Sequence, residues 1–306
     1  MDKETINQII RLYKKGFSIR KIEKIISGKY HKESIRENLK RSGMILRGIG
    51  IIYKNYGQFS SEENDLFAEL LGYLYGDGSL HKYKNTSHGI YDCHLAFSLN
   101  EADLVKRIVK ITNNLFKFIP KVIRKKSIYL IKFRRSFAKY LANIGYPIGK
   151  KSILNPNFPL EILKYDSMKR HFICGFLNAE ATVNETITVQ QSVRINLPLG
   201  IINFLKKKNK PYKMNDLECY FIKFSKIKSL NLNIQESKML LDLKKLLNEF
   251  GIQSAIYPIR LYIGRKNKTS IHFELHISPK FIRKIKDFNM LSCTKKVEKL
   301  NKLLQG

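Results

Sequence analysis

The sequence predicts an α+β protein in which two pseudo-symmetric αββαββα repeats follow an all-α domain at the N-terminus. Three observations predict this class. Two apolar helices with small residues four apart each end on an acid, the elements after each helix follow one order, and three short amphipathic helices come first. The expected parts are a domain at 1–48, a linker at 49–60, and repeats at 61–155 and 160–306.

The 306 residues carry a formal net charge of +32, from 57 Lys and Arg against 25 Asp and Glu, and the sequence pI is about 9.9. A hydrophobic content of 43% argues against disorder and supports a sizeable core. A chain this basic favours a polyanionic partner, nucleic acid first, with an anionic membrane surface or a ribosomal assembly as alternatives. The most apolar helix, at 66–75, is too short to span a bilayer.

The four cysteines are scattered along the chain without any CxxC pair. Zinc ribbons and a disulfide framework are therefore not expected, and a reducing intracellular setting fits. The N-terminus opens with Asp2, Lys3 and Glu4 rather than with an apolar run, so we expect no signal peptide. We expect an intracellular protein, in the cytoplasm and nucleoid or in an organelle.

Residues 1–48 predict three short helices, because isoleucines recur at helical spacing and glycines mark the turns. This spacing is that of a helix-turn-helix, whose last helix, here about 31–41, enters the major groove. The stretch resembles the resolvase-like helix-turn-helix class. Its base-facing residues would be Lys32, Ser34, Ile35 and Arg36. The alternative is a helical bundle whose basic face is solvated or meets another protein.

Ser60 or Ser61 is expected to cap a long helix whose last turns, residues 70–78, read LLGYLYGDG. Gly72 and Gly76 lie four apart on one face, where missing side chains let another backbone approach. Asp77 is unusual, because a carboxylate at a helix C-terminus faces the negative end of the macrodipole. We expect Gly78 to be a left-handed cap, and a bound cation would resolve the electrostatic conflict.

A second copy of this helix follows at residues 172–180, which read FICGFLNAE. Gly175 and Ala179 are its small pair and Glu180 is its terminal acid. Two such helices could pack through their small faces and bring both acids together at one end. These two stretches resemble the motif of the LAGLIDADG homing endonucleases, in the monomeric form with two copies. The second copy departs from the family at Ala181, where glycine is usual.

The elements after each motif predict an internal duplication. After the first come a strand at 95–99, a helix near 101–115, two strands and a short helix, and the same order returns after Glu180. Laying the strand at 95–99 on residues 230–234 gives an offset of 135, whereas the two acids are 103 apart. The second repeat is therefore expected to carry an insertion of 32 residues, near 197–217.

The resemblance implies the homing endonuclease fold, with the two helices at a pseudo-twofold interface and their acids binding the metals that cut DNA. The expected metal ligands are Asp77 and Glu180, with the carbonyls of Gly76 and Ala179, and Mg²⁺ (or Mn²⁺) suits such an oxygen set. By the overlay, Asn100 and Gln235 would position water. In the family a lysine in the segment after each repeat's sheet helps to activate water or to stabilise charge. The candidates here are Lys150 or Lys151 and Lys295 or Lys296, with Lys151 and Lys296 as the expected pair and generic phosphate contact as the alternative.

The resemblance also implies that the polar faces of the two sheets form a saddle over a long major-groove site. In residues 271–277, His272, Glu274 and His276 alternate with apolar residues. They could bind a metal, but we favour the polar face of a sheet that lies on DNA. The other expected contacts are Lys82, Lys84, Asn85, Lys132, Arg134, Gln190, Arg194, Lys223, Arg260, Arg265 and Lys266.

The leading hypothesis is a magnesium-dependent, monomeric endonuclease that makes a staggered double-strand break at one long asymmetric DNA target. The alternatives on this fold are a DNA-binding transcriptional regulator and a maturase with intron RNA as partner. An acid at the end of both helices favours cutting, since a regulator has no need of them. A basic scaffold with incidental acids is disfavoured because the motif occurs twice in a duplicated frame. No membrane partner is expected, and an intron-encoded or free-standing origin fits the absence of flanking splicing residues.

Overall fold

The computed structural model describes residues 2–14, 19–26, 30–42, 59–83, 90–214, 217–230, 232 and 234–305. Most of the expected linker, together with Lys84 and Asn85, lies outside these residues. The chain forms two compact units, Met1–Lys54 and Asn55–Gly306, each of which is described by itself.

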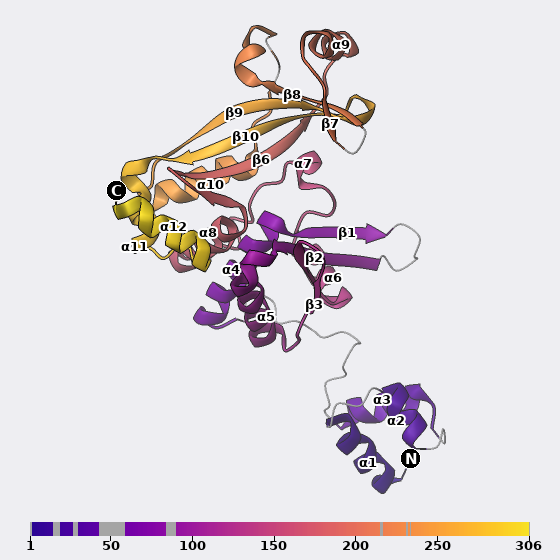
Figure 1. The fold of residues 1–306 in the computed structure, drawn as a ribbon. Coiled ribbons are helices and arrows are strands. Elements are labelled where there is room, and N and C mark those ends of the chain that lie inside the picture. The colour runs from indigo at the N-terminus through magenta and orange to yellow at the C-terminus, as the bar shows by residue number, and fades with distance from the viewer. Residues whose placement is uncertain are drawn as a thin grey trace. The chain divides into compact units, whose positions relative to one another are not determined.

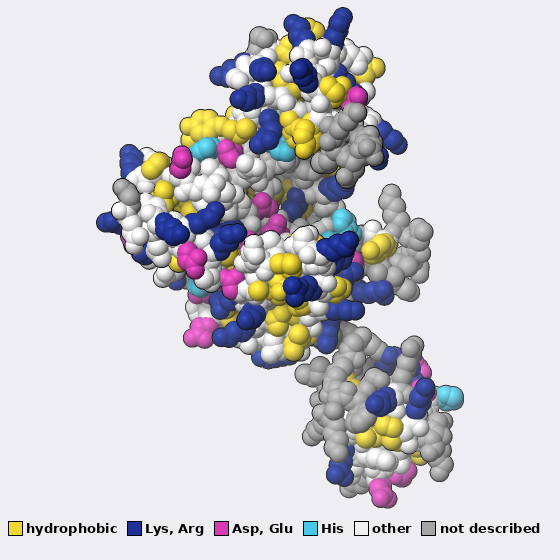
Figure 2. Space-filling model, viewed as in Figure 1, with side chains coloured by type: hydrophobic (Ala, Val, Ile, Leu, Met, Phe, Trp, Pro, Cys, Tyr) yellow, Lys and Arg dark blue, Asp and Glu magenta, His cyan; other side chains and the backbone are white. Residues whose placement is uncertain are grey.

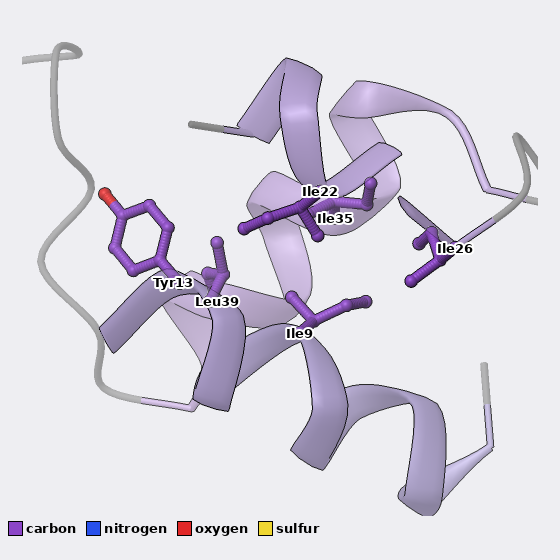
Figure 3. Packing of buried hydrophobic residues seen from close by; sticks show 6 residues of the cluster. All are labelled: Ile9, Tyr13, Ile22, Ile26, Ile35 and Leu39. Atoms are coloured by element: carbon purple, nitrogen blue, oxygen red, sulfur yellow. The ribbon is translucent and has the colours of Figure 1, made fainter. Parts of the chain in front are cut away.

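The first unit consists of helices α1 (Lys3–Lys14), α2 (Ile19–Ile25) and α3 (Lys32–Arg41). Their apolar faces meet in a small core (Figure 3) formed by Ile9, Tyr13, Ile22, Ile26, Ile35 and Leu39. Glu23 on α2 accepts a hydrogen bond from the backbone N–H of Lys32 at 3.2 Å, which ties α2 to the start of α3. The three expected helices are thus present.

The first repeat begins with α4 (Ser61–Asp77), whose Ser60 side chain and Glu63 form the capping box that the sequence suggests. A four-stranded antiparallel sheet of order β1-β2-β4-β3 and two helices complete it. These elements are β1 (Ser79–Tyr83), β2 (Ile90–Ser98), a 3-10 turn at Leu99–Glu101, α5 (Ala102–Phe116), β3 (Lys121–Arg124), β4 (Ile128–Lys132) and α6 (Arg135–Asn143). The short helix α7 (Lys151–Leu154) lies in the connector.

The second repeat has the same order, as Figure 1 shows. It consists of α8 (Asp166–Glu180), β5 (Ala181–Val183), β6 (Ile187–Ile195), α10 (Lys238–Glu249), β9 (Ser254–Ile263), β10 (Thr269–Ile277) and α11 (Ile282–Asp287), followed by α12 (Thr294–Gln305). The predicted fold class, two αββαββα repeats after an all-α unit, is confirmed.

The expected insertion lies between β6 and α10, and its ordered elements are α9 (Leu199–Lys208), β7 (Tyr212–Met214) and β8 (Leu217–Lys223). β8 pairs with β9, so the second sheet has six strands in the order β5-β6-β10-β9-β8-β7. The predicted strand at 230–234 is wrong: Leu230 ends a 3-10 turn, and Leu232 and Ile234 lie in no strand. A two-residue period over five residues did not identify the second strand of this repeat, which is β6 and lies between β5 and β10.

Helices α4 and α8 pack through their small residues, as predicted. A Cβ added at Gly72 would overlap the carbonyl oxygen of Phe172 and lie 3.0 Å from the Cα of Gly175. A Cβ at Gly175 would in turn overlap the carbonyl oxygen of Glu69. The obstacles are backbone atoms, which cannot rotate away as a side chain can. Glycine is therefore required at both positions for the helices to approach this closely.

The expected left-handed cap at Gly78 is wrong. Gly78 has φ −74° and ψ 149°, because α4 runs directly into the extended backbone of β1. Ala181 has nearly the same conformation, φ −74° and ψ 138°, between α8 and β5. Both residues donate their backbone N–H to the residue four positions earlier. The two turns match, so alanine at 181 does not disturb the pseudo-symmetry.

Candidate active site

Asp77 and Glu180 are the last residues of α4 and α8, and the close helix packing brings them together. A Cβ added at Gly76 would lie 3.1 Å from the Cγ of Glu180 and would touch the Cβ of Ala179. Both carboxylates therefore lie where two helix C-termini, each with a partial negative charge, also meet. In Figure 2, acidic side chains lie in the hollow between the two repeats.

The carboxylates are placed where negative charge is unfavourable. Desolvation, followed by the charge of Glu180, raises the pKa of Asp77 to about 7. The Asp77 side chain remains open to solvent, so water and a metal can reach it. Desolvation also raises the pKa of Glu180, against the opposing effect of Lys151. Two neighbouring acids with raised pKa values form a site that a cation would stabilise.

Two lysines occupy equivalent positions at the two helix ends. The Lys151 ammonium donates to the carbonyl oxygen of Tyr75 at 2.6 Å and to that of Gly76. The Lys296 ammonium donates to the carbonyl oxygens of Asn178, at 2.5 Å, and Ala179, at 3.4 Å. Positive charge is favourable at a helix C-terminus. The structure thus places Lys151 and Lys296 at the acids, whereas their neighbours Lys150 and Lys295 are exposed.

Burial lowers the pKa of the Lys151 ammonium to about 8, although Glu180 and Asp77 oppose this shift. Burial also lowers the pKa of Lys296. Each ammonium is thus closer to losing its proton than an exposed lysine would be. The site combines two carboxylates that hold protons unusually well with two amines that hold them less well.

The segment that carries Lys296 is fixed by residues from both repeats. Asn178, buried on α8, accepts hydrogen bonds from the backbone N–H groups of Ser292, at 3.0 Å, and Cys293, at 2.8 Å. Asp103, on α5 of the first repeat, accepts from the backbone N–H of Thr294 at 2.7 Å and from its hydroxyl at 2.9 Å. Helix α12 therefore begins at a position that the first repeat helps to set.

Two residues near the acids were not predicted. The Gln191 side chain on β6 forms a hydrogen bond that lowers the pKa of Glu180. Glu101 lies close enough to raise the pKa of Asp77, and it lines a pocket of about 260 Å³ together with Glu180 and Lys296. The sequence carries a signal for Gln191. Apolar and polar residues alternate along β6, and Gln191 is a polar residue at a position where this alternation places an apolar, buried one.

The expected water-positioning residues are placed differently. Asn100 is exposed in the 3-10 turn after β2, next to Glu101. Gln235 is exposed in the segment that leads from the insertion into α10. β6 rather than residues 230–234 is the counterpart of β2, so the overlay of those two strands was wrong, and the role expected of Gln235 stays a prediction. Gln191 is the polar side chain that the second repeat directs at its acid.

The donor set fits a hard divalent cation. Asp77 and Glu180 supply carboxylate oxygens, and the carbonyls of Gly76 and Ala179 already face the cationic groups of Lys151 and Lys296. Mg²⁺ favours a few oxygen ligands together with water and substrate phosphates. Within the described ranges, no group of three or more His, Cys, Asp and Glu could hold a metal. The remaining ligands would therefore come from carbonyls, water or a phosphate.

The outer face of the second sheet is polar, as predicted. His272, Glu274 and His276 alternate along β10 with residues that are buried on the opposite face. Glu274 accepts hydrogen bonds from Gln190, at 2.7 Å, and pairs with His276 at 2.8 Å, so these groups satisfy one another. The same outer face carries Arg194, opposite Ser270, and Arg260, opposite His272 and Lys223. Arg265 and Lys266 lie in the turn between β9 and β10.

The first sheet presents fewer of the expected contacts. Lys132 lies opposite His94 on the face that also carries His81. Lys82 alternates to the other face, where its ammonium lies 5.9 Å from the centre of the Tyr91 ring. Arg134 caps α6 and stacks over Phe118. On α3 of the first unit, Ser34 is exposed and Arg36 is partly buried beside Glu33.

No protein-family model and no curated protein matches this sequence. Similar solved structures include mesophilic variants from the homing endonuclease I-DmoI (16% identity, covering 77% of this chain and 97% of that chain, TM-score 0.44). Others are I-WcaI bound to its DNA recognition sequence (14%, 85% and 97%, 0.41) and the N-terminal LAGLIDADG domain of DUF199/WhiA (14%, 80% and 89%, 0.36). No helix in the described part of the chain is long and apolar enough to cross a membrane.

Proposed function

We propose that this chain is a site-specific, divalent-metal-dependent endonuclease that cuts both strands of DNA. The observation that carries the proposal is the pair of acids, Asp77 and Glu180, held together at the ends of two abutting helices with raised pKa values. A single acid at a helix C-terminus destabilises a protein only slightly and needs no functional explanation. Two in a duplicated frame, each with a partly buried lysine bound to its helix end, support a built catalytic site.

Hydrolysis of a phosphodiester needs an activated water, neutralised charge on the phosphate, and a stabilised leaving oxygen, and divalent metals supply all three. Asp77 and Glu180 would hold the metals, with the carbonyls of Gly76 and Ala179. Lys151 and Lys296 place positive charge beside both acids. There the two ammonium groups would stabilise the negative charge of a scissile phosphate. Gln191 orients the Glu180 carboxylate through its hydrogen bond.

Double-stranded DNA is the partner that the charge supports. The net charge of +32 and the cationic, polar outer faces of the sheets match a phosphate backbone on either side of the acids. Both half-sites would be bound by one chain whose repeats differ in sequence. The target is therefore expected to be asymmetric and the enzyme monomeric, with the two acids serving opposite strands and a staggered cut. Magnesium is the expected metal, and the protein would act inside the cell where its DNA target lies.

The test is selection of cleaved targets from a randomised plasmid library in Mg²⁺, followed by comparison of wild type with Asp77→Asn and Glu180→Gln. We expect the wild type to linearise a defined target and both variants to bind it without cutting. Lys150→Ala and Lys295→Ala are matched controls, because these exposed lysines adjoin the two site lysines, and they should retain most activity. Tight, specific binding by a wild type that never cuts in Mg²⁺ or Mn²⁺ would favour a DNA-binding regulator instead.

A further inference from the structure

The two sheets differ at one edge. The first ends at β3, whereas the second continues past the corresponding strand, β9, with β8 and β7 from the insertion. The extension is firmly attached: Ile202 and Leu205 of α9 are buried, and the Lys206 ammonium donates to the side chain of Asn267 at 2.7 Å. The added strands therefore form a fixed surface with no counterpart among the described strands of the first repeat.

A row of rings crosses the outer face of this extended edge. The ring centres of Tyr212 on β7 and Phe221 on β8 are 6.0 Å apart, and those of Phe221 and Tyr262 on β9 are 5.0 Å apart. His272 on β10 continues the row, 6.2 Å from Tyr262. The Tyr262 hydroxyl also lies 3.2 Å from the Cys219 sulfur. Strand pairing thus fixes the rings in one line across four strands.

The outer two rings are open to solvent. Tyr212 is 60% exposed and Phe221 is 42% exposed. Lys223 lies on the same face of β8 as Phe221. In the strand register it is opposite Arg260 on β9, so two cationic side chains are neighbours on this face. Figure 2 shows Lys and Arg side chains over α9 and the outer strands, with hydrophobic patches between them. Exposed rings on a cationic face indicate a binding surface rather than a core.

We propose that Tyr212 and Phe221 read the methyl groups of thymine in the half-site that the second repeat binds. This inference rests on the proposed function, because it assumes that the outer sheet face lies in the major groove. The 5-methyl group of thymine is the apolar feature that a base pair presents there, and aromatic side chains contact it. Lys223 and Arg260 would hold the flanking phosphates, which carry no sequence information. Among the described residues the first sheet ends at β3 without added strands, so recognition by these two rings belongs to the half-site of the second repeat.

The experiment replaces thymine by deoxyuridine, one position at a time, in the target selected with the full chain, and measures binding by fluorescence anisotropy. Removing one buried methyl group should weaken wild-type binding about fourfold. We expect this loss at one or two thymines, all on the same side of the cut. Phe221→Ser and Tyr212→Ser should bind the thymine target less tightly and should no longer distinguish it from the deoxyuridine target at those positions.

Tyr165→Ser is the matched control, because Tyr165 is 62% exposed but precedes α8 and lies on neither sheet. It should keep the full deoxyuridine effect. Failure of the wild type to bind any DNA target specifically overturns the proposed function itself. Specific binding with no deoxyuridine effect, or with the same effect in Phe221→Ser, overturns only this inference. If Phe221→Ser instead changes the oligomeric state of the free protein and leaves discrimination intact, the row is a protein interface and the inference is wrong.

Discussion

The packing of α4 against α8 predicts that alanine at Gly72 destabilises the protein, although alanine is the better helix former. Alanine in place of glycine inside a helix gains about 0.8–1 kcal/mol. Here the new Cβ would overlap the carbonyl oxygen of Phe172 and crowd the backbone of Gly175. Overpacking of a well-packed interface costs about 1–3 kcal/mol, and the upper end applies because backbone cannot rotate aside. We expect a net loss of about 1–2 kcal/mol.

Gly200→Ala is the matched control, because Gly200 lies near the start of α9 and a Cβ there would meet no atom within 4 Å. That substitution should stabilise by about 0.5 kcal/mol. The assay is urea denaturation followed by circular dichroism, taking the transition of the larger unit, Asn55–Gly306. Gly72→Ala should also slow cleavage, since separated helices separate the acids. An increase in the urea midpoint similar to that of Gly200→Ala would refute the reasoning.

Three further predictions concern charge and the first unit. The raised pKa of Asp77 means that the folded state holds a proton which the unfolded state releases, so metal-free stability should fall as pH rises from about 4 to about 7. Melting curves at pH 5 and pH 8 should show Asp77→Asn gaining on the wild type at the higher pH, and Mg²⁺ should reduce that gain. Glu69→Gln should lower the free energy of unfolding by about 2 kcal/mol, because Glu69 is buried against the half-exposed Arg107 with an N–O distance of 2.5 Å. The measurement is urea denaturation, and an unchanged midpoint would contradict this prediction. Deleting residues 1–47 should weaken DNA binding and flatten its salt dependence without abolishing cleavage, and an unchanged salt dependence would count against a DNA role for that unit.

The helix interface and the acid pair could be predicted because their determinants are local in sequence. Small residues four apart define a close-packing face, and an acid that follows them breaks the rules for helix ends. The second copy then supplied the partner. The sequence could also narrow each lysine to two neighbouring residues. Only the three-dimensional structure selects Lys151 and Lys296, because the selection depends on which side chain reaches a helix end.

The error over residues 230–234 had a different origin. That segment alternates apolar and polar residues, as a strand does, but the second strand of this repeat, β6, lies before the insertion. Strand pairing is a non-local property, and an alternating pattern in five residues does not record its partner. The polar side chain that contacts Glu180 is Gln191, and the available signal was a polar, partly buried residue on the otherwise buried face of β6.

The cap that Asp103 provides to Thr294 has a consequence for chimeras made by exchanging repeats between proteins of this fold. The lysine at the second acid lies on a helix whose first turn is held by the first repeat. A second contact acts in the same direction: Asn155 of the connector accepts from the backbone N–H of Lys238 at 2.9 Å, at the start of α10. The second repeat therefore depends on residues that precede it for the alignment of two of its helices. A chimera joined within the connector would keep both motifs and still misplace Lys296, unless the residues at 103 and 155 were transplanted with their partners.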